Sequence, residues 1–268
     1  MKAAKRIINT LVYAFLYMPL AVMIFFSFNK AKSTVAFGGF SFYWYGEVFK
    51  NSETLNALKN TLILAVVSAA VATILGTIAA IGIYLLKKKA AREAMMAVTN
   101  IPMMNPDIVT GVSLMLLFVF VGHLLGKTEC LNFWTLLIAH VSFNLPYVIL
   151  NVLPKLRQTD KSIFEAAQDL GASPVKAFFL VIMPQIVPGI VSGAVMSFTL
   201  SLNDYVISCF TNGMDFQTLP LLIEAMTRRK VKPDMYALST LIFIAVLLLL
   251  IISNIIEAHS EKKQEKKI

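Results

Sequence analysis

Two carboxylates stand where an apolar chain rarely places them. Asp107 lies inside a long apolar run, in N-P-D-I-V-T-G, and Asp204 follows directly on another such run. An ionisable side chain within an apolar membrane segment is costly and is a functional candidate by default. We therefore expect both acids to line a water-accessible path between helices. For Asp107 the alternative is a structural one, in which it caps a helix interrupted at Pro106.

Asp204 also ends a polar stripe in the segment F-T-L-S-L-N-D-Y. Ser197, Ser201 and Asp204 share one helical face at i, i+4 and i+7, whereas Thr199 and Asn203 pair on another side. A polar stripe that leaves an apolar helix suits the wall of a pathway. We predict that Ser201, Asn203 and Asp204 belong to it; the alternative is a frayed helix end with a solvated aspartate.

Aromatic and imidazole groups add further candidates. Tyr43, Trp44 and Tyr45 lie in F-S-F-Y-W-Y, near the end of the first apolar run. Such rings are interfacial anchors in many membrane proteins, and their faces can also hold a cation, so Trp44 is a second kind of pathway candidate. His140 and Asn144 lie in another apolar run, where we expect them to make hydrogen bonds between packed helices.

The elements that must position these side chains are apolar helices. The chain of 268 residues is 57% hydrophobic and 15% charged, which places it among integral membrane proteins. A membrane span needs about 20 mostly apolar residues. Six segments qualify, and they predict an all-α integral membrane protein with six transmembrane helices in a single domain, 1–268: 7–28, 61–86, 97–125, 131–153, 178–202 and 237–257.

Lys and Arg are concentrated at both ends of the chain and in the loops after the second and fourth predicted spans. Because basic residues favour the cytoplasmic side, this pattern predicts a multi-pass protein of the plasma (inner) membrane with both termini in the cytoplasm. The net charge of +9 is then mostly topological. No basic run is interleaved with stacking aromatics, so we expect contact with the lipid bilayer and none with nucleic acid.

Several enzyme motifs fail on their spacing. The segment G-H-L-L-G-K-T at 122–128 has three residues between its glycines where a phosphate loop has four, and no strand precedes it. The three histidines are far apart, and neither H-E-x-x-H nor G-x-S-x-G occurs. We expect no ATPase activity, cofactor or metal in this chain, with a membrane enzyme as the remote alternative. Cys130 and Cys209 stand either as free thiols or as a pair.

A short polar helix is predicted within a loop at about 154–177, between two spans. Ser162 and Glu165 form a capping box, and small apolar residues recur at helical spacing along one face. Gly171 suits the left-handed position that ends a helix. Ser173 and Pro174 then suit the N-cap and first turn of the next helix. The alternative is that the segment only connects two helices, and that Glu165 is only a capping residue.

The same segment resembles the EAA loop of ABC-importer permeases, E-A-A-x3-G-x9-I-x-L-P. The residues that match this pattern, with Val181 and Met183 in the places of Ile and Leu, are Glu165, Ala166, Ala167, Gly171, Val181, Met183 and Pro184. The resemblance implies a MetI-like permease fold in which Glu165, Ala166, Ala167 and Gly171 couple the chain to an ATPase.

Over nearly its full length the chain resembles the second permease subunit of spermidine/putrescine ABC importers. The segments that carry this are W-Y-G-E-V-F, N-P-D-I-V-T-G-V-S-L, F-T-L-S-L-N-D-Y-V-I-S-C-F and T-L-P-L-L-I-E-A-M. The resemblance implies polyamine import with a partner permease, two ATP-binding cassette ATPases and an extracytoplasmic substrate-binding protein. Acids and aromatic faces at Asp107, Asp204, Trp44 and Glu224 suit a linear polycation. Asn203 stands where the family often has a second acid, which leaves another small solute as the alternative.

Overall fold

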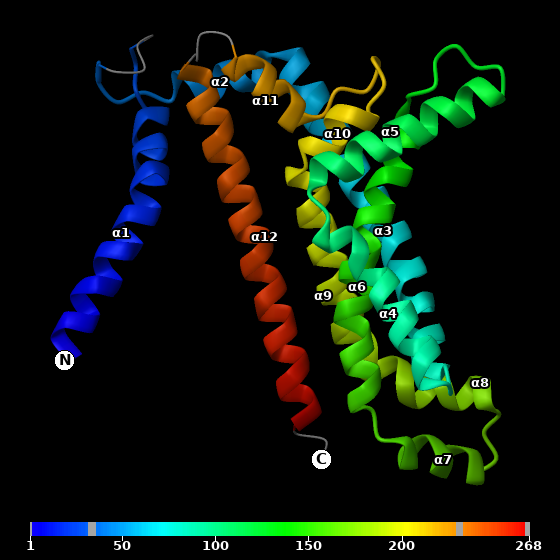
Figure 1. The fold of residues 1–268 in the computed structure, drawn as a ribbon. Coiled ribbons are helices and arrows are strands. Elements are labelled where there is room, and N and C mark those ends of the chain that lie inside the picture. Colours follow the sequence, from blue (N-terminus) through cyan, green and yellow to red (C-terminus); the bar gives the residue numbers. More distant parts are fainter. Residues whose placement is uncertain (1, 32–35, 229–232, 266–268) are drawn as a thin grey trace. The chain divides into compact units, whose positions relative to one another are not determined.

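The computed structural model describes residues 2–31, 36–228 and 233–265. These residues form helices and no β-strand, with one isolated bridge between Asn29 and Phe40. The elements, labelled in Figure 1, are α1 (Lys2–Ser27), α2 (Tyr43–Lys50), α3 (Ser52–Leu85), α4 (Lys89–Met104), α5 (Asp107–Leu124), α6 (Phe133–Gln158), α7 (Lys161–Asp169), α8 (Pro174–Ala177), η1 (Phe178–Ile182), α9 (Met183–Asn203), α10 (Val206–Thr211), α11 (Leu219–Thr227) and α12 (Pro233–Glu265).

Among the described residues, five helical stretches are long and apolar enough to cross a membrane: Lys5–Ser27, Ser52–Leu85, Asp107–Leu124, Phe133–Gln158 and Pro174–Asn203. The protein is therefore an all-α, multi-pass membrane protein. The sixth predicted span, 237–257, falls within α12, whose described apolar stretch is Asp234–Leu248; some of its later side chains lie outside the described residues.

The chain packs as two units. One comprises residues 1–57 and 222–249, and the other comprises 58–221 and 250–268. In the first unit, the rings of Phe28, Phe40, Phe42 and Tyr45 gather at the end of α1, and Phe26 lies beside Tyr236 of α12. That all residues form a single permease domain stays a prediction.

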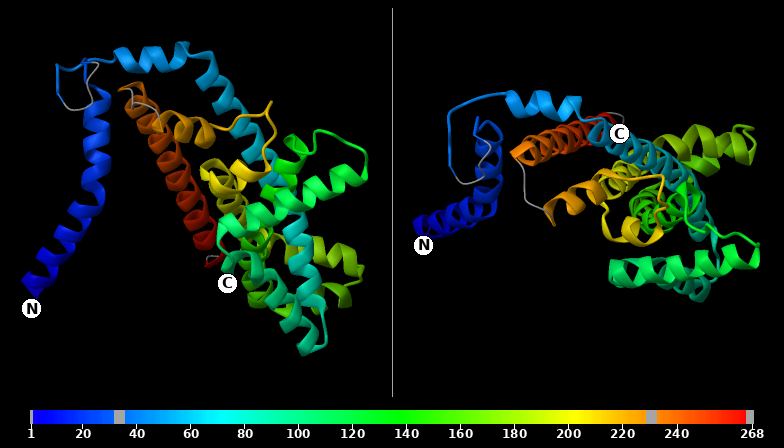
Figure 2. Two further views of the ribbon diagram at one scale, coloured as in Figure 1. Left: turned by 45° about the horizontal axis from the view of Figure 1, so that its top comes forward. Right: turned by 90° about the horizontal axis from the view of Figure 1, so that it is seen from above.

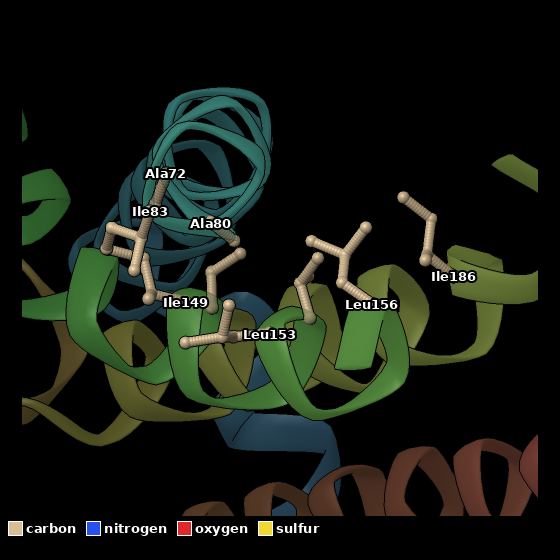
Figure 3. Close-up of a cluster of buried hydrophobic side chains, with 9 residues drawn as sticks. Ala72, Ala80, Ile83, Ile149, Leu153, Leu156 and Ile186 are labelled. Carbon is tan, nitrogen blue, oxygen red and sulfur yellow. The ribbon is translucent and has the colours of Figure 1, made fainter. Parts of the chain in front are cut away.

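The core of the second unit lies where α3, α6 and α9 meet. Figure 3 shows Ala72, Ala80 and Ile83 of α3 facing Ile149, Leu153 and Leu156 of α6, with Ile186 of α9 beside them. Glycines allow this close approach. A Cβ on Gly189 of α9 would lie 2.6 Å from the carbonyl oxygen of Asn151 in α6. Small residues four apart are a typical packing signal between membrane helices, and Gly189 and Gly193 form such a pair.

The predicted span 97–125 is two helices, α4 and α5. Asn105 has ψ 141° and Pro106 has ψ 137°, so both are extended. A residue before proline is driven out of the α-helical region by the proline ring, which ends α4. The expected interruption at Pro106 is confirmed, and Figure 2 shows that α4 and α5 run in different directions.

A π-helical turn, η1, joins α8 to α9. The amide of Met183 donates to the carbonyl of Phe178, five residues earlier. Pro184 follows at once, and its ring would clash with the carbonyl four residues before it in a regular α-helix. The wider turn relieves this crowding, and π-turns occur often at functional positions.

Candidate functional site

Ser201 lies at the centre of a buried hydrogen-bonded cluster that joins three helices. Its hydroxyl oxygen lies 2.9 Å from Ser68 Oγ of α3 and accepts a hydrogen bond from Asn144 Nδ2 of α6 at 2.7 Å. Ser201 is 2% exposed, and Ser68 and Asn144 are fully buried. Hydrogen bonds of this kind contribute about 0.6 kcal/mol each between membrane helices. The cluster therefore fixes α3, α6 and α9 against one another near the end of α9.

Asp204 holds the start of α10. Its Oδ1 accepts from the amide of Ile207 at 3.3 Å, and its Oδ2 accepts from both the amide and the hydroxyl of Ser208 at 2.8 Å. Its side chain is 9% exposed, so the alternative of a solvated aspartate at a frayed end is wrong. The carboxylate satisfies amides that the first turn of α10 would otherwise leave unpaired.

His140 connects α6 to this cap. Its Nε2 lies 3.0 Å from Ser208 Oγ and 3.6 Å from Asp204 Oδ2, and the residue is fully buried. The expectation that His140 and Asn144 hydrogen-bond between packed helices is confirmed. His140 Nδ1 and Asn144 Oδ1 have no hydrogen-bond partner within the described part of the chain.

Asp107 is the first residue of α5 and is exposed. Its carboxylate accepts no hydrogen bond from any described residue, so it does not cap the interrupted helix through its side chain. One turn later, a Cβ on Gly111 would lie 2.9 Å from Phe210 and 3.4 Å from Ile207, both in α10. Asp107 precedes this α5–α10 contact by about a turn, and Asp204 precedes Ile207 by about the same distance. Each acid thus lies about one turn along the chain from the same helix contact.

The two remaining pathway candidates have different surroundings. Asn203 is exposed and lies away from the buried face that carries Ser197 and Ser201, as the helical spacing predicted. Trp44, in the first unit, is 9% exposed, and its Nε1 donates to the carbonyl of Asn29 at 2.8 Å. Its indole therefore packs within that unit and ties α2 to the chain that follows α1.

The helix α7 begins two residues earlier than the sequence predicted. Asp160, not Ser162, is its N-cap, and the Asp160 carboxylate accepts from the amide of Ser162 at 2.9 Å. A capping box between Ser162 and Glu165 is therefore wrong: the preceding aspartate takes the position because aspartate is an equally good cap. The Ser162 amide holds the pKa of the Asp160 carboxyl below its usual value, which keeps the cap ionised.

The end of α7 and the start of α8 follow the prediction. Gly171 has φ +86°, its amide donates to the Gln168 carbonyl, and the amide of Ala172 donates to the Ala167 carbonyl. These two bonds are a Schellman motif. Ser173 caps α8 by accepting from the amide of Lys176 at 3.3 Å. This leaves Glu165 and Ala166 exposed on a short, firmly ended helix, with Ala167 half-buried.

The phosphate-loop lookalike is a helix end. The amide of Lys127 donates to the Gly122 carbonyl at 2.9 Å, that of Gly126 to the His123 carbonyl at 3.0 Å, and Gly126 has φ +72°. These glycines terminate α5 in another Schellman motif. Cys130 and Cys209 are free thiols.

Ser68 is a member of the buried cluster that sequence reasoning missed. It lies in an apolar run, and the residues three and four positions away on either side are all apolar. The pairing of α6 with α9 had a signal in G-I-V-S-G at 189–193, where two glycines four apart allow close packing.

The chain is similar in sequence to membrane proteins of transport systems. Residues 72–266 match the model of the family described as binding-protein-dependent transport system inner membrane component. The putrescine transport system permease protein PotI of Escherichia coli (strain K12) is 38% identical over 262 residues, covering 98% of this chain and 93% of PotI. The spermidine/putrescine transport system permease protein PotC of Haemophilus influenzae is 39% identical over 245 residues, 91% of this chain and 93% of PotC.

Solved structures share the fold at low identity. A chain of a bacterial ABC transporter that imports the acidic polysaccharide alginate has a TM-score of 0.75 at 15% identity, covering 97% of this chain and 95% of that one. A chain of the MetNI methionine ABC transporter has a TM-score of 0.60 at 16% identity, covering 77% of this chain and 95% of that one. The family match over residues 72–266 and the relatives at 38–39% identity point to the same family. The chain belongs to the binding-protein-dependent transport system inner membrane components, the permease subunits of ABC importers.

Proposed function

We propose that this chain is one permease subunit of an ABC importer for polyamines. The observation that carries the proposal is identity of 36–39% to permeases whose names specify putrescine or spermidine and putrescine, over 91–98% of the chain. The alginate and methionine transporters share only the fold, so they say nothing about the solute. In this proposal the chain supplies part of the translocation pathway, and ATP is hydrolysed by partner subunits.

The proposed partners are a second permease subunit, two ATP-binding cassette ATPases and an extracytoplasmic substrate-binding protein. In this arrangement α7 lies in the cytoplasm, as do both termini, and the inner membrane holds the spans. Glu165, Ala166, Ala167 and Gly171 form the ATPase contact. Support comes from their placement: a helix capped at both ends transmits a displacement with little fraying, and small side chains permit close approach.

Asp107 and Asp204 supply the negative charge of the proposed pathway. Each acid lies about one turn along the chain from the α5–α10 contact, Asp107 with an exposed carboxylate and Asp204 with a largely covered one. Asp204 acts through its field rather than by direct contact, since three hydrogen bonds occupy its oxygens. Asn203 offers an exposed amide beside it, and Ser201 holds the helix end in place. Trp44 contributes by fixing the segment after α1.

Uptake by the assembled importer tests this function. Complexes in proteoliposomes, supplied with their binding protein and ATP, are given radiolabelled putrescine, spermidine or a neutral sugar. We expect ATP-dependent uptake of one or both polyamines and none of the sugar. Uptake of the sugar alone would leave an ABC permease for another solute, which is the reading that Asn203 in place of an acid would favour.

A further inference from the structure

A large, mostly apolar cavity lies between α7 and the neighbouring ends of α3 and α6. Its volume is about 820 Å³, within the range of about 300–1,000 Å³ that ligand sites occupy. The apolar wall includes side chains from the end of α3, from α7 and from the α8–η1 turn: Ile81, Tyr84, Leu85, Phe164, Val175 and Phe178. Because α3 and α6 are membrane-spanning helices, their ends lie where the apolar and polar phases meet.

A second, smaller hollow of about 660 Å³ adjoins the cavity and is cationic. Arg92 lines both spaces, and Lys89 and Arg157 line the smaller one. Lys89 lies 3.8 Å from Glu93, and both side chains are exposed, so this pair is weak. Within the described part of the chain, Arg92 and Arg157 form no ion pair. The lining thus holds three basic side chains and one acidic one, Glu93, and its two guanidinium groups are unpaired among the described residues.

The larger cavity also has two acidic groups in its lining. Asp160 and Glu165 come from the α7 side, and Asp160 is already engaged as the cap of that helix. An anion entering the cavity is thus directed away from α7 and toward Arg92. Basic and acidic side chains balance in the lining of the larger, mostly apolar cavity, whereas basic side chains are in excess in the smaller hollow. The two hollows thus differ as the tail and head of an anionic lipid do.

We propose that the two hollows together bind one anionic glycerophospholipid. Its phosphate lies between Arg92 and Arg157, and an acyl chain fills the apolar cavity beneath α7. Arginine matches a phosphate with paired, planar donors, and basic pockets at the membrane boundary recognise lipid head groups. An acyl chain in the cavity would contact Phe164 of α7 and Val175 of α8, so a bound anionic lipid would stabilise the position of α7 against the bundle. The site does not depend on which solute is carried.

The test uses the whole complex in nanodiscs of phosphatidylcholine with and without phosphatidylglycerol, followed by native mass spectrometry. We expect wild type to retain phosphatidylglycerol, and Arg92→Gln/Arg157→Gln to retain it about 30-fold less strongly, from the loss of two basic contacts. Lys88→Gln is the matched control, since Lys88 is an exposed neighbour that lines neither hollow, and it should behave as wild type. Equal retention by wild type and the double variant overturns the proposal.

The tail has its own test. Val175→Trp places bulk in the cavity and should reduce retention, while Leu170→Trp, at a residue that is 90% exposed and outside the lining, should not. Unchanged retention by Val175→Trp contradicts a tail in this cavity. Thermal protection by inorganic phosphate alone, equal to that by lipid, would mean a free anion site and refute the lipid. Retention by the permease pair but not by the complex with its ATPases would show that an ATPase fills the hollow, and would refute it too.

Discussion

Asp204→Asn separates the charge of the Asp204 carboxylate from its role as a helix cap. Asparagine caps a helix about as well as aspartate: its single amide oxygen can still accept from the amide of Ser208, and only the longer bond from the Ile207 amide, at 3.3 Å, is lost. The lost interaction with the α10 dipole costs about 0.3–1 kcal/mol of folding stability. A unit charge acting on a cation at about 8 Å, with an effective dielectric constant of about 20, contributes about 2 kcal/mol. We therefore expect polyamine uptake to fall about 30-fold, with a small loss of thermal stability.

Ser208→Ala is the matched control for this prediction. It removes the hydroxyl that donates to Asp204 at 2.8 Å and lies 3.0 Å from His140, at a cost of about 1.5–3 kcal/mol for a hydrogen bond to a charged group. It leaves the charge in place. Stability should thus fall more in Ser208→Ala than in Asp204→Asn, and uptake should fall less.

The assay compares uptake of putrescine and spermidine, normalised to inserted complex, with thermal unfolding of the purified complex. Asn203→Asp adds a second acid beside the first at an exposed position, and we expect equal or faster uptake. If uptake follows stability across the three variants, Asp204 is a cap only and the electrostatic reasoning is refuted.

Three further substitutions test the proposed ATPase contact of α7, the role of Asp107 in the pathway and the packing of α9 against α6. Ala167→Trp adds bulk to the small-residue face of α7 and should leave ATP hydrolysis uncoupled from uptake; unchanged coupled activity would contradict the ATPase contact. Asp107→Leu should lower uptake at least tenfold with normal membrane insertion, because it removes the exposed carboxylate, and normal uptake would remove Asp107 from the pathway. Gly189→Val should destabilise the complex by about 1–3 kcal/mol in thermal unfolding, since its Cβ would lie 2.6 Å from the Asn151 carbonyl oxygen. Gly82→Val is the control, because a Cβ on Gly82 has nothing within 4 Å. Equal melting temperatures of the two variants would contradict the close packing of α9 on α6.

Local signals in the sequence predicted the long apolar helices and some of the helix ends. Apolar length found the spans because a bilayer demands it, and Gly171, Ser173 and Pro174 each marked a helix end through their own backbone or side-chain chemistry. The misplaced cap at Ser162 shows the limit of such signals: Asp160 and Ser162 are both good caps, and the choice between them depends on where the preceding helix stops.

The buried polar cluster was harder to predict because it is built by tertiary contact. Spacing placed Ser197, Ser201 and Asp204 on one face, but nothing in the sequence said that Ser68 and Asn144 lie opposite. This face packs against α3 and α6 around Ser201, and that it also lines a pathway stays a prediction. Asp107 and Asp204 are far apart in the chain, so their shared position at the α5–α10 contact depends on the fold.

The π-turn at Phe178–Ile182 keeps two out-of-phase segments facing the same way. Along α9 the inward positions recur every three or four residues, at Ile186, Gly189 and Gly193. The next inward residues toward the N-terminus are Ile182, four before Ile186, and fully buried Ala177, five before Ile182. A regular helix turns about 100° per residue, so if these five residues wound as a regular α-helix, Ala177 would be rotated away from the core. The π-turn therefore contains one residue more than a regular helix needs here. A one-residue deletion inside the turn should keep the same face of α8 toward the core, whereas a one-residue deletion in α9 would rotate the residues on one side of it relative to those on the other.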